Sequence, residues 1–174
     1  NVYVQKEIEY IPRDEPFELT KTTFDENIEA GTAIAMFQMN YPYTTDGDYT
    51  FNLAPGNGIT DADNDKFTVR GDSLVTLEKF NFEKQGVYLI NAQARGPSFT
   101  PKNYFTLKIK DISEAPYLTD SFPDVKYRVG EPLQENLPVF YFVDEDAGDN
   151  LDYLRTLANG DDLPDWLNID DNLI

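Results

Sequence analysis

Carboxylate side chains are the groups in this sequence with the greatest capacity for chemistry. The 174 residues contain 32 Asp and Glu against 14 Lys and Arg, a formal net charge of −18. From Ala115 to Ile174 there are 14 acidic residues, and the only basic ones are Lys126, Arg128 and Arg155. Self-repulsion at this density costs stability unless cations offset part of it. Composition leaves two interpretations open: a solubilising acidic surface, or carboxylates clustered to hold calcium.

The residue types that are missing argue against catalysis. The sequence has no Cys and no His, which removes thiolate nucleophiles, disulfides and the usual general base near neutral pH. Carboxylate pairs such as Asp144 and Asp146 could still do acid–base chemistry, but they lie on one short segment and do not obviously flank a cleft. No phosphate loop, nucleophile elbow or cofactor fingerprint is present. We therefore expect no enzyme and no catalytic or cofactor-binding residues.

The sequence predicts that short β-strands position these carboxylates. Gly and Pro punctuate the chain every few residues, and helical periodicity is absent over any useful length. Seven strands are expected in the first part: 17–24, 31–39, 49–53, 67–69, 74–77, 87–94 and 104–109. Such a series predicts a Greek-key sandwich of the immunoglobulin type. A second unit begins at Ala115-Pro116, with strands expected at 125–129, 139–143 and 151–154.

Several motifs of the first part resemble a known family in order and spacing. They are Phe24-Asp25-Glu26-Asn27 with Gly31-Thr32, Phe67-Thr68-Val69, Gly71-Asp72-Ser73-Leu74, Phe80-Asn81-Phe82-Glu83, Tyr88, and Asp111-Ile112-Ser113-Glu114-Ala115-Pro116. This pattern resembles a cadherin repeat, and the closing segment resembles the bacterial style of that repeat. The resemblance implies that residues 15–114 form a cadherin-like β-sandwich. Residues 1–14 would then be the last strand of a preceding repeat and a linker.

The second unit resembles a different cadherin-like domain. Gly130-Glu131-Pro132, Phe142-Val143-Asp144-Glu145-Asp146 and Leu163-Pro164-Asp165-Trp166-Leu167 are similar to the dystroglycan type. Residues 115–174 would be the N-terminal part of such a domain, because about 60 residues are short for a sandwich. The expected fold is therefore all-β, with tandem immunoglobulin-like or cadherin-like Greek-key sandwiches and an incomplete second domain. Trp166 is expected to fill a core.

The resemblance also implies calcium between the two domains. Carried over by matching motif positions, the ligands would be Glu26, Glu83, Asp111 and Glu114 from the first motif set, and Asp144 and Asp146 from the second, with Asp149 a weaker candidate. Asn81 and Ser113 depart from the family pattern, and Asn81 replaces a charged ligand, which lowers the expected calcium affinity. The alternative is a joint held by Pro116 and domain packing, with solvated carboxylates.

Two other acidic places are expected to hold no calcium. The joint before the first domain has Met39-Asn40 where the family pattern has acidic residues, and Arg13 puts a positive charge in its linker beside Asp14 and Glu15. The segment Asp61-Ala62-Asp63-Asn64-Asp65 resembles the start of an EF-hand calcium loop. The sixth residue of such a loop is Gly, whereas this sequence has Lys66 there. We expect an ordinary acidic loop before a strand.

The resemblance implies a structural or adhesive module of a larger tandem-repeat protein, stiffened by calcium at its joint. The expected place is extracellular or at the cell surface, with the parent protein anchored to a membrane or wall. Partners would be neighbouring domains of the same chain and another surface protein or a second copy. The alternative is an accessory carbohydrate-binding region of a secreted polysaccharide-degrading enzyme, for which exposed aromatics on one sheet face would be the sign. The negative charge makes nucleic acid an unsuitable partner.

Overall fold

The computed structural model describes residues 15–40, 44, 47–97, 99–121, 126, 128–131, 142–152, 154, 156–165 and 167. The chain divides into two compact units, Asn1–Ile112 and Ser113–Ile174. The domain limits expected from the sequence stay predictions, and the strand expected within residues 1–11 and the core role expected of Trp166 fall outside the described residues. Within those residues there is no helix with the length and apolarity needed to cross a membrane.

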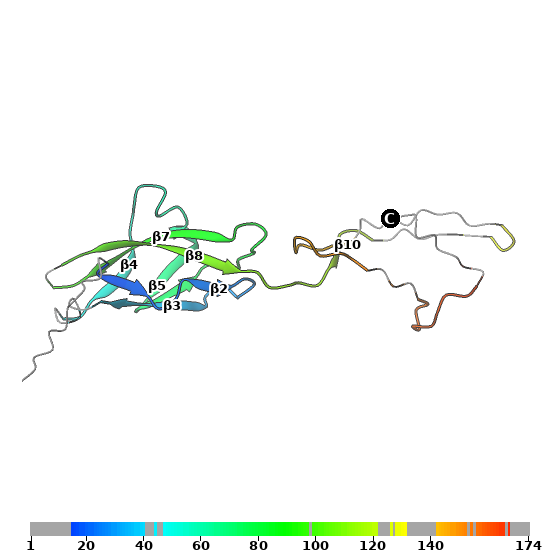
Figure 1. The fold of residues 1–174 in the computed structure, drawn as a ribbon, viewed down its shortest axis with the longest axis horizontal. Helices are drawn as coiled ribbons and strands as arrows, with labels where there is room; N and C mark the ends of the chain where they lie inside the picture. Colours follow the sequence, from blue (N-terminus) through cyan, green and yellow to red (C-terminus); the bar gives the residue numbers. More distant parts are fainter. Residues whose placement is uncertain are drawn as a thin grey trace, which may run out of the picture. The chain divides into compact units, whose positions relative to one another are not determined.

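Unit 1 is a sandwich of two four-stranded sheets, which form its two layers in Figure 1. In order across the first sheet lie β1 (Phe17–Leu19), β3 (Ala33–Met39), β6 (Ser73–Thr76) and β5 (Phe67–Arg70). Across the second lie β2 (Thr23–Asp25), β8 (Lys102–Lys110), β7 (Val87–Arg95) and β4 (Thr50–Leu53). All pairs are antiparallel except β2 with β8. The predicted all-β sandwich is confirmed.

One predicted strand is in fact two. The segment 17–24 was expected to be continuous, but β1 pairs with β3 in one sheet while β2 pairs in parallel with β8 in the other. Phe17, Leu19 and Phe24 all face the core. Residues 17 and 19 share one parity and residue 24 has the other, so a single period-two strand cannot bury all three. The chain therefore crosses between the sheets over residues 20–22.

Aromatic side chains fill the space between the two sheets. Four lie in one group, with Phe37 stacked on Phe51 at 5.2 Å between ring centroids. Phe17 and Phe105 complete this group. A second group is made by Phe24, Phe67, Phe80 and Tyr88. Tilted and offset pairs at these distances add to the free energy gained from burying apolar surface.

The second group holds the end of the sandwich from which the chain leaves unit 1. Phe80 is 1% exposed and packs against Phe67, Tyr88 and Phe24. The turn that follows Phe80 and the loop that follows β2 lie at this end, joined by a hydrogen bond from the Asn27 amide to the Phe80 carbonyl at 3.0 Å. The aromatic core therefore fixes the backbone from which the candidate site residues of unit 1 project.

Unit 2 contains one small sheet within the described residues. Strand β9 (Tyr117–Leu118) pairs antiparallel with β10 (Phe142–Val143), so that Val143 lies opposite Tyr117. β10 is the described end of the strand expected over 139–143. Leu151, Asp152 and Leu154, expected to be strand, lie outside any strand. Their alternation of residue types is not enough, because a strand also needs a hydrogen-bonded neighbour.

Candidate metal centre

Glu26 is the most deeply buried of the candidate ligands. It follows β2 directly and is only 3% exposed. One carboxylate oxygen, Oε2, accepts the backbone N–H of Phe82 at 2.8 Å, and Oε1 accepts that of Ile112 at 2.8 Å. These bonds hold the carboxylate at the junction of three chain segments. An ionised carboxylate has about four acceptor sites, so a cation could still bind it.

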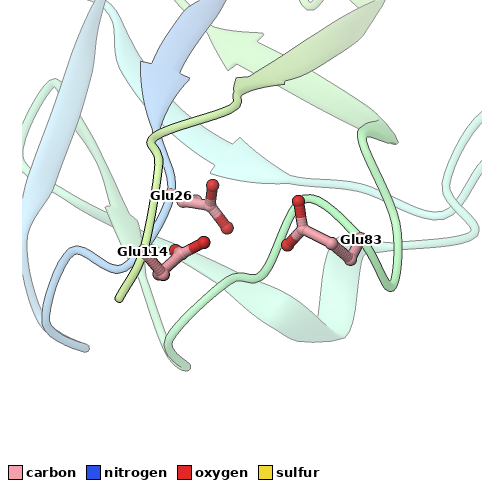
Figure 2. A group of neighbouring side chains, drawn as sticks. All are labelled: Glu26, Glu83 and Glu114. Carbon is pink, nitrogen blue, oxygen red and sulfur yellow. The ribbon is translucent and has the colours of Figure 1, made fainter. Parts of the chain in front are cut away.

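The turn that carries Glu83 is built locally. Asn81 Oδ1 accepts the backbone N–H of Lys84 at 2.8 Å, which caps the turn. Figure 2 shows Glu26 and Glu83 projecting from separate segments of this end, and one oxygen of each lies within 4.8 Å of the other. Asn81, which departs from the family pattern, thus has a structural role in placing Glu83.

Asp111 adds a third carboxylate to this end of unit 1. It comes directly after β8 and is exposed, and one of its oxygens lies within 4.8 Å of an oxygen of Glu83. Like charges at such distances repel one another, and partial burial strengthens the repulsion. A divalent cation would convert this unfavourable arrangement into a favourable one. Unit 1 therefore brings together Glu26, Glu83 and Asp111 from three distant parts of the sequence.

In unit 2 the small sheet places the remaining candidates. Asp146 lies three residues after Val143, and Glu114 lies three residues before Tyr117, which is the partner of Val143 in the sheet. Accordingly, the backbone N–H of Glu114 donates to Asp146 Oδ2 at 2.8 Å. The N–H of Asp146 in turn donates to Asp144 Oδ1 at 3.0 Å. These bonds orient the two aspartates that follow β10.

Three aspartates of unit 2 have the spacing that a calcium site needs. One oxygen each from Asp144, Asp146 and Asp149 lies within 4.8 Å of the others. Oxygens that each lie about 2.3–2.6 Å from one Ca²⁺ cannot be more than about 5.2 Å apart, so the spacing fits. Among the described residues no Lys or Arg forms an ion pair with these aspartates. This group of three aspartates includes Asp149, which the sequence analysis gave as a weaker candidate ligand for calcium.

A tyrosine stands beside this aspartate group. A hydrogen bond with Glu145, strengthened by the charge of that carboxylate, raises the pKa of the Tyr117 phenol. Tyr117 therefore stays neutral over the physiological range and can donate to Glu145. Glu145 is thus the partner of Tyr117, whereas Asp146 accepts the Glu114 amide and Asp144 accepts the Asp146 amide.

The acidic loop at residues 61–65 is used in a different way. Asp63 is 8% exposed, and its Oδ2 accepts the Leu89 N–H at 2.7 Å. Asn64 Oδ1 accepts the Asn91 N–H at 2.9 Å. Both side chains thus bind the part of β7 that lies beyond its pairing with β4, and Asn64 begins the short helix η2 (Asn64–Lys66). Hydrogen bonds from the Gly56 and Gly58 amides lower the pKa of Asp61.

Polar residues at the joint before the first domain form hydrogen bonds within unit 1. Asn40 is 8% exposed, and its Nδ2 donates to the Glu15 carbonyl at 2.9 Å. The Glu15 carboxylate accepts a hydrogen bond from Asn103 at 3.3 Å. Asp14 lies outside the described residues. The expectation that no calcium binds at this junction stays a prediction.

Comparisons with known proteins give matches among solved structures alone. No protein family and no curated protein matches the sequence. The protocadherin gamma-B4 extracellular domain is 20% identical, with 78% of this chain and 24% of that chain covered and a TM-score of 0.48. Human protocadherin-24 EC1-2 is 12% identical, covering 72% and 56%, with a TM-score of 0.47. The third cadherin domain of human protocadherin 7 is 17% identical, covering 59% and 92%, with a TM-score of 0.40.

This chain therefore spans about a quarter of the length of the protocadherin gamma-B4 chain. The matches are similarities of chain path at low sequence identity. The sandwich of unit 1 follows from its own strand order and pairing.

Proposed function

We propose that this chain is an extracellular structural or adhesive module whose two domains are joined by calcium. The ligands would be the six residues named from the motifs, Glu26, Glu83, Asp111, Glu114, Asp144 and Asp146, together with Asp149. The observation that carries the proposal is the gathering of carboxylates in each unit. In unit 1, a carboxylate oxygen of Glu83 lies within 4.8 Å of an oxygen of Glu26 and of an oxygen of Asp111. In unit 2, an oxygen of Asp146 lies within 4.8 Å of an oxygen of Asp144 and of an oxygen of Asp149.

Covalent geometry supports a shared site. Glu26 binds the amide of Ile112, which ends unit 1, and Asp146 binds the amide of Glu114 in unit 2. Only Ser113 separates the two anchored residues, and two residues of chain span at most about 7 Å. In this proposal, calcium would draw ligands from both sets of carboxylates and would restrict bending of the linker.

The wider role follows from the same proposal. A calcium-stiffened joint suits a protein that projects from a cell surface as a rod and presents its faces to another surface protein or a second copy. In this account residues 15–114 are one cadherin-like domain and residues 115–174 belong to a second. We propose no catalytic role. The carboxylates of Glu26, Asp144 and Asp146 accept backbone amides, and their oxygens are the ligands that a hard cation prefers.

Thermal unfolding tests the proposal. A ligand that binds the folded state raises its stability by RT ln(1 + [L]/Kd). We expect millimolar calcium to raise the unfolding midpoint of the wild-type chain above its value in excess chelator. The shift should vanish in an Asp144→Asn, Asp146→Asn variant. Equal midpoints for wild type with calcium and with chelator would refute calcium binding and leave only a packed joint with solvated carboxylates.

A further inference from the structure

The outer face of the β2-β8-β7-β4 sheet carries a charge opposite to that of the chain as a whole. Strand β8 alternates strictly, so its odd-numbered residues are buried or half-buried and its even-numbered residues are exposed. The basic residues at outward positions of β7 and β8 are Arg95, Lys102, Lys108 and Lys110. The acidic residue at an outward position of these four strands is Asp25 on β2. Four positive charges against one therefore stand on this face of a chain with a net charge of −18.

Among the described residues, two of these four cations have an acidic neighbour and two do not. Lys110 Nζ lies 3.9 Å from Asp25, a pair exposed on both sides and therefore weak. Lys102 Nζ donates to the Pro55 carbonyl at 3.1 Å, and its charge helps to lower the pKa of Asp61, so a nearby carboxylate offsets part of this positive charge. Within the described part of the chain, Lys108 and Arg95 form no ion pair. At physiological salt, charges more than about 8 Å away are largely screened, so the charges that a ligand on this face meets are these four cations, Asp25 and Asp61.

An aromatic ring and neutral amides lie among the cations. Tyr104 is 61% exposed and lies between Lys102 and Lys108 on β8. The register sets Lys102 opposite Gln93, and Gln93 opposite Asn52 on β4. Strands rise by about 3.3 Å per residue, so the outward side chains from Lys102 to Lys110 form a straight row about 26 Å long. β7 and β8 run side by side in this layer, as Figure 1 shows.

We propose that this face, defined by Arg95, Lys102, Tyr104, Lys108 and Lys110, binds a linear acidic polysaccharide along β8. The ammonium groups would pair with carboxylate or sulfate groups of the sugar. The Tyr104 ring would stack against the apolar face of one sugar ring, since the electron-rich face of an aromatic ring attracts weakly positive hydrogens. Gln93 and Asn52 would hydrogen-bond to hydroxyl groups.

The chemistry of the face favours a polysaccharide over a protein partner. The centre of a protein interface is depleted of charged residues, and Lys is among the least favoured there. The large hydrophobic side chains exposed on the described strands of this sheet are Tyr104 and Val87, which is too little for a buried apolar centre. A flat row of cations with one aromatic platform instead matches a repeating anionic chain. The proposal does not depend on calcium.

Affinity electrophoresis of the full chain in chelator tests this site. The gels would contain polygalacturonate, dextran sulfate, unmodified dextran or double-stranded DNA, at about 0.1 M salt so that long-range attraction is screened. We expect retardation by polygalacturonate, by dextran sulfate or by both, which would identify the anionic group. Dextran and DNA should give none.

Variants then locate the binding. Lys108→Glu and Tyr104→Ala should each weaken binding by about tenfold or more, a loss of about 1.4 kcal/mol. Arg70→Glu makes the same charge change on the other sheet and should leave binding unchanged, and unfolding midpoints would show that each variant is folded. The proposal is overturned if no acidic polysaccharide retards the wild type, if DNA or dextran retards it equally, or if Arg70→Glu matches Lys108→Glu.

Discussion

Glu26 accepts the backbone amide of Ile112, 86 residues further along the chain, at 2.8 Å. The same carboxylate also accepts the amide of Phe82, so one buried side chain ties together the loop after β2, the turn that carries Glu83, and the last residue of unit 1. The candidate metal centre is therefore built into the hydrogen bonding of the sandwich. Its structural role and its proposed role in binding calcium can be separated by experiment.

Glu26→Ala should destabilise the protein even without calcium. The substitution leaves the amides of Phe82 and Ile112 without their acceptor, and each such loss costs about 1–3 kcal/mol. Urea unfolding in chelator measures this free energy. The matched control is Glu29→Ala, three residues away and exposed, which should change stability by less than about 0.5 kcal/mol. Equal effects of the two substitutions would show that the hydrogen bonds from backbone amides to Glu26 do not contribute to stability.

Asp63→Ala should destabilise unit 1 and leave calcium binding unaltered. Its carboxylate accepts hydrogen bonds from the Leu89 amide and from Gln85 Nε2 at 2.7 and 3.1 Å. Removing them at an 8% exposed position should cost about 1–3 kcal/mol. Asp65→Ala in the same loop is the control, because that side chain is exposed. A loss of calcium affinity on changing Asp63 would instead make the acidic loop a metal site.

Alkaline pH should destabilise unit 1 through Tyr88. Burial raises the pKa of this phenol, because the charged phenolate is poorly solvated inside the sandwich. The folded state therefore favours the neutral form. The resulting stability is complete below the unfolded pKa of about 10 and is lost as the pH rises toward the higher folded value.

The free energy of unfolding, measured between about pH 8 and pH 11, tests whether stability falls as the pH rises. Tyr88→Phe removes the ionisable group and keeps the ring, so its stability should fall less steeply over this range than that of the wild type. Tyr104→Phe, at an exposed position, is the control and should keep the wild-type slope. Parallel slopes for Tyr88→Phe and the wild type would show that another group causes the loss.

The sequence predicted the class of fold because alternation and turn residues are local signals. β7 and β8 lie where apolar residues alternate over 87–94 and 104–109, and the structure pairs them over seven positions. The division of 17–24 into two strands was missed, although the change of parity between Leu19 and Phe24 was visible. No Gly or Pro marks residues 20–22, and the reason for the switch lies in the sheets on either side.

The sequence predicted which residue types form the candidate site. It did not predict the hydrogen bonds that hold these residues in place. Motif resemblance named Glu26, Glu83 and Asp111, and the fold places an oxygen of Glu83 within 4.8 Å of an oxygen of each of the other two. That Glu26 holds Ile112, and that Asp63 and Asn64 bind the edge of β7, depends on contacts between residues 26 to 86 positions apart. Pairings over such separations leave no trace in local composition. The hydrogen bond from the Glu114 amide to the Asp146 carboxylate is likewise a product of the folded chain.

Calcium titration of two single variants tests most directly whether one site draws ligands from both units. Glu83→Gln removes a charge from unit 1, and Asp146→Asn removes one from unit 2, each with little change of shape. Asp72→Asn and Asp165→Asn make the same change at exposed positions and serve as controls. The account predicts that both site variants weaken calcium binding by about tenfold or more, while both controls leave it unchanged. Loss in Asp146→Asn alone would mean a site confined to Asp144, Asp146 and Asp149, and would contradict a calcium-bound joint.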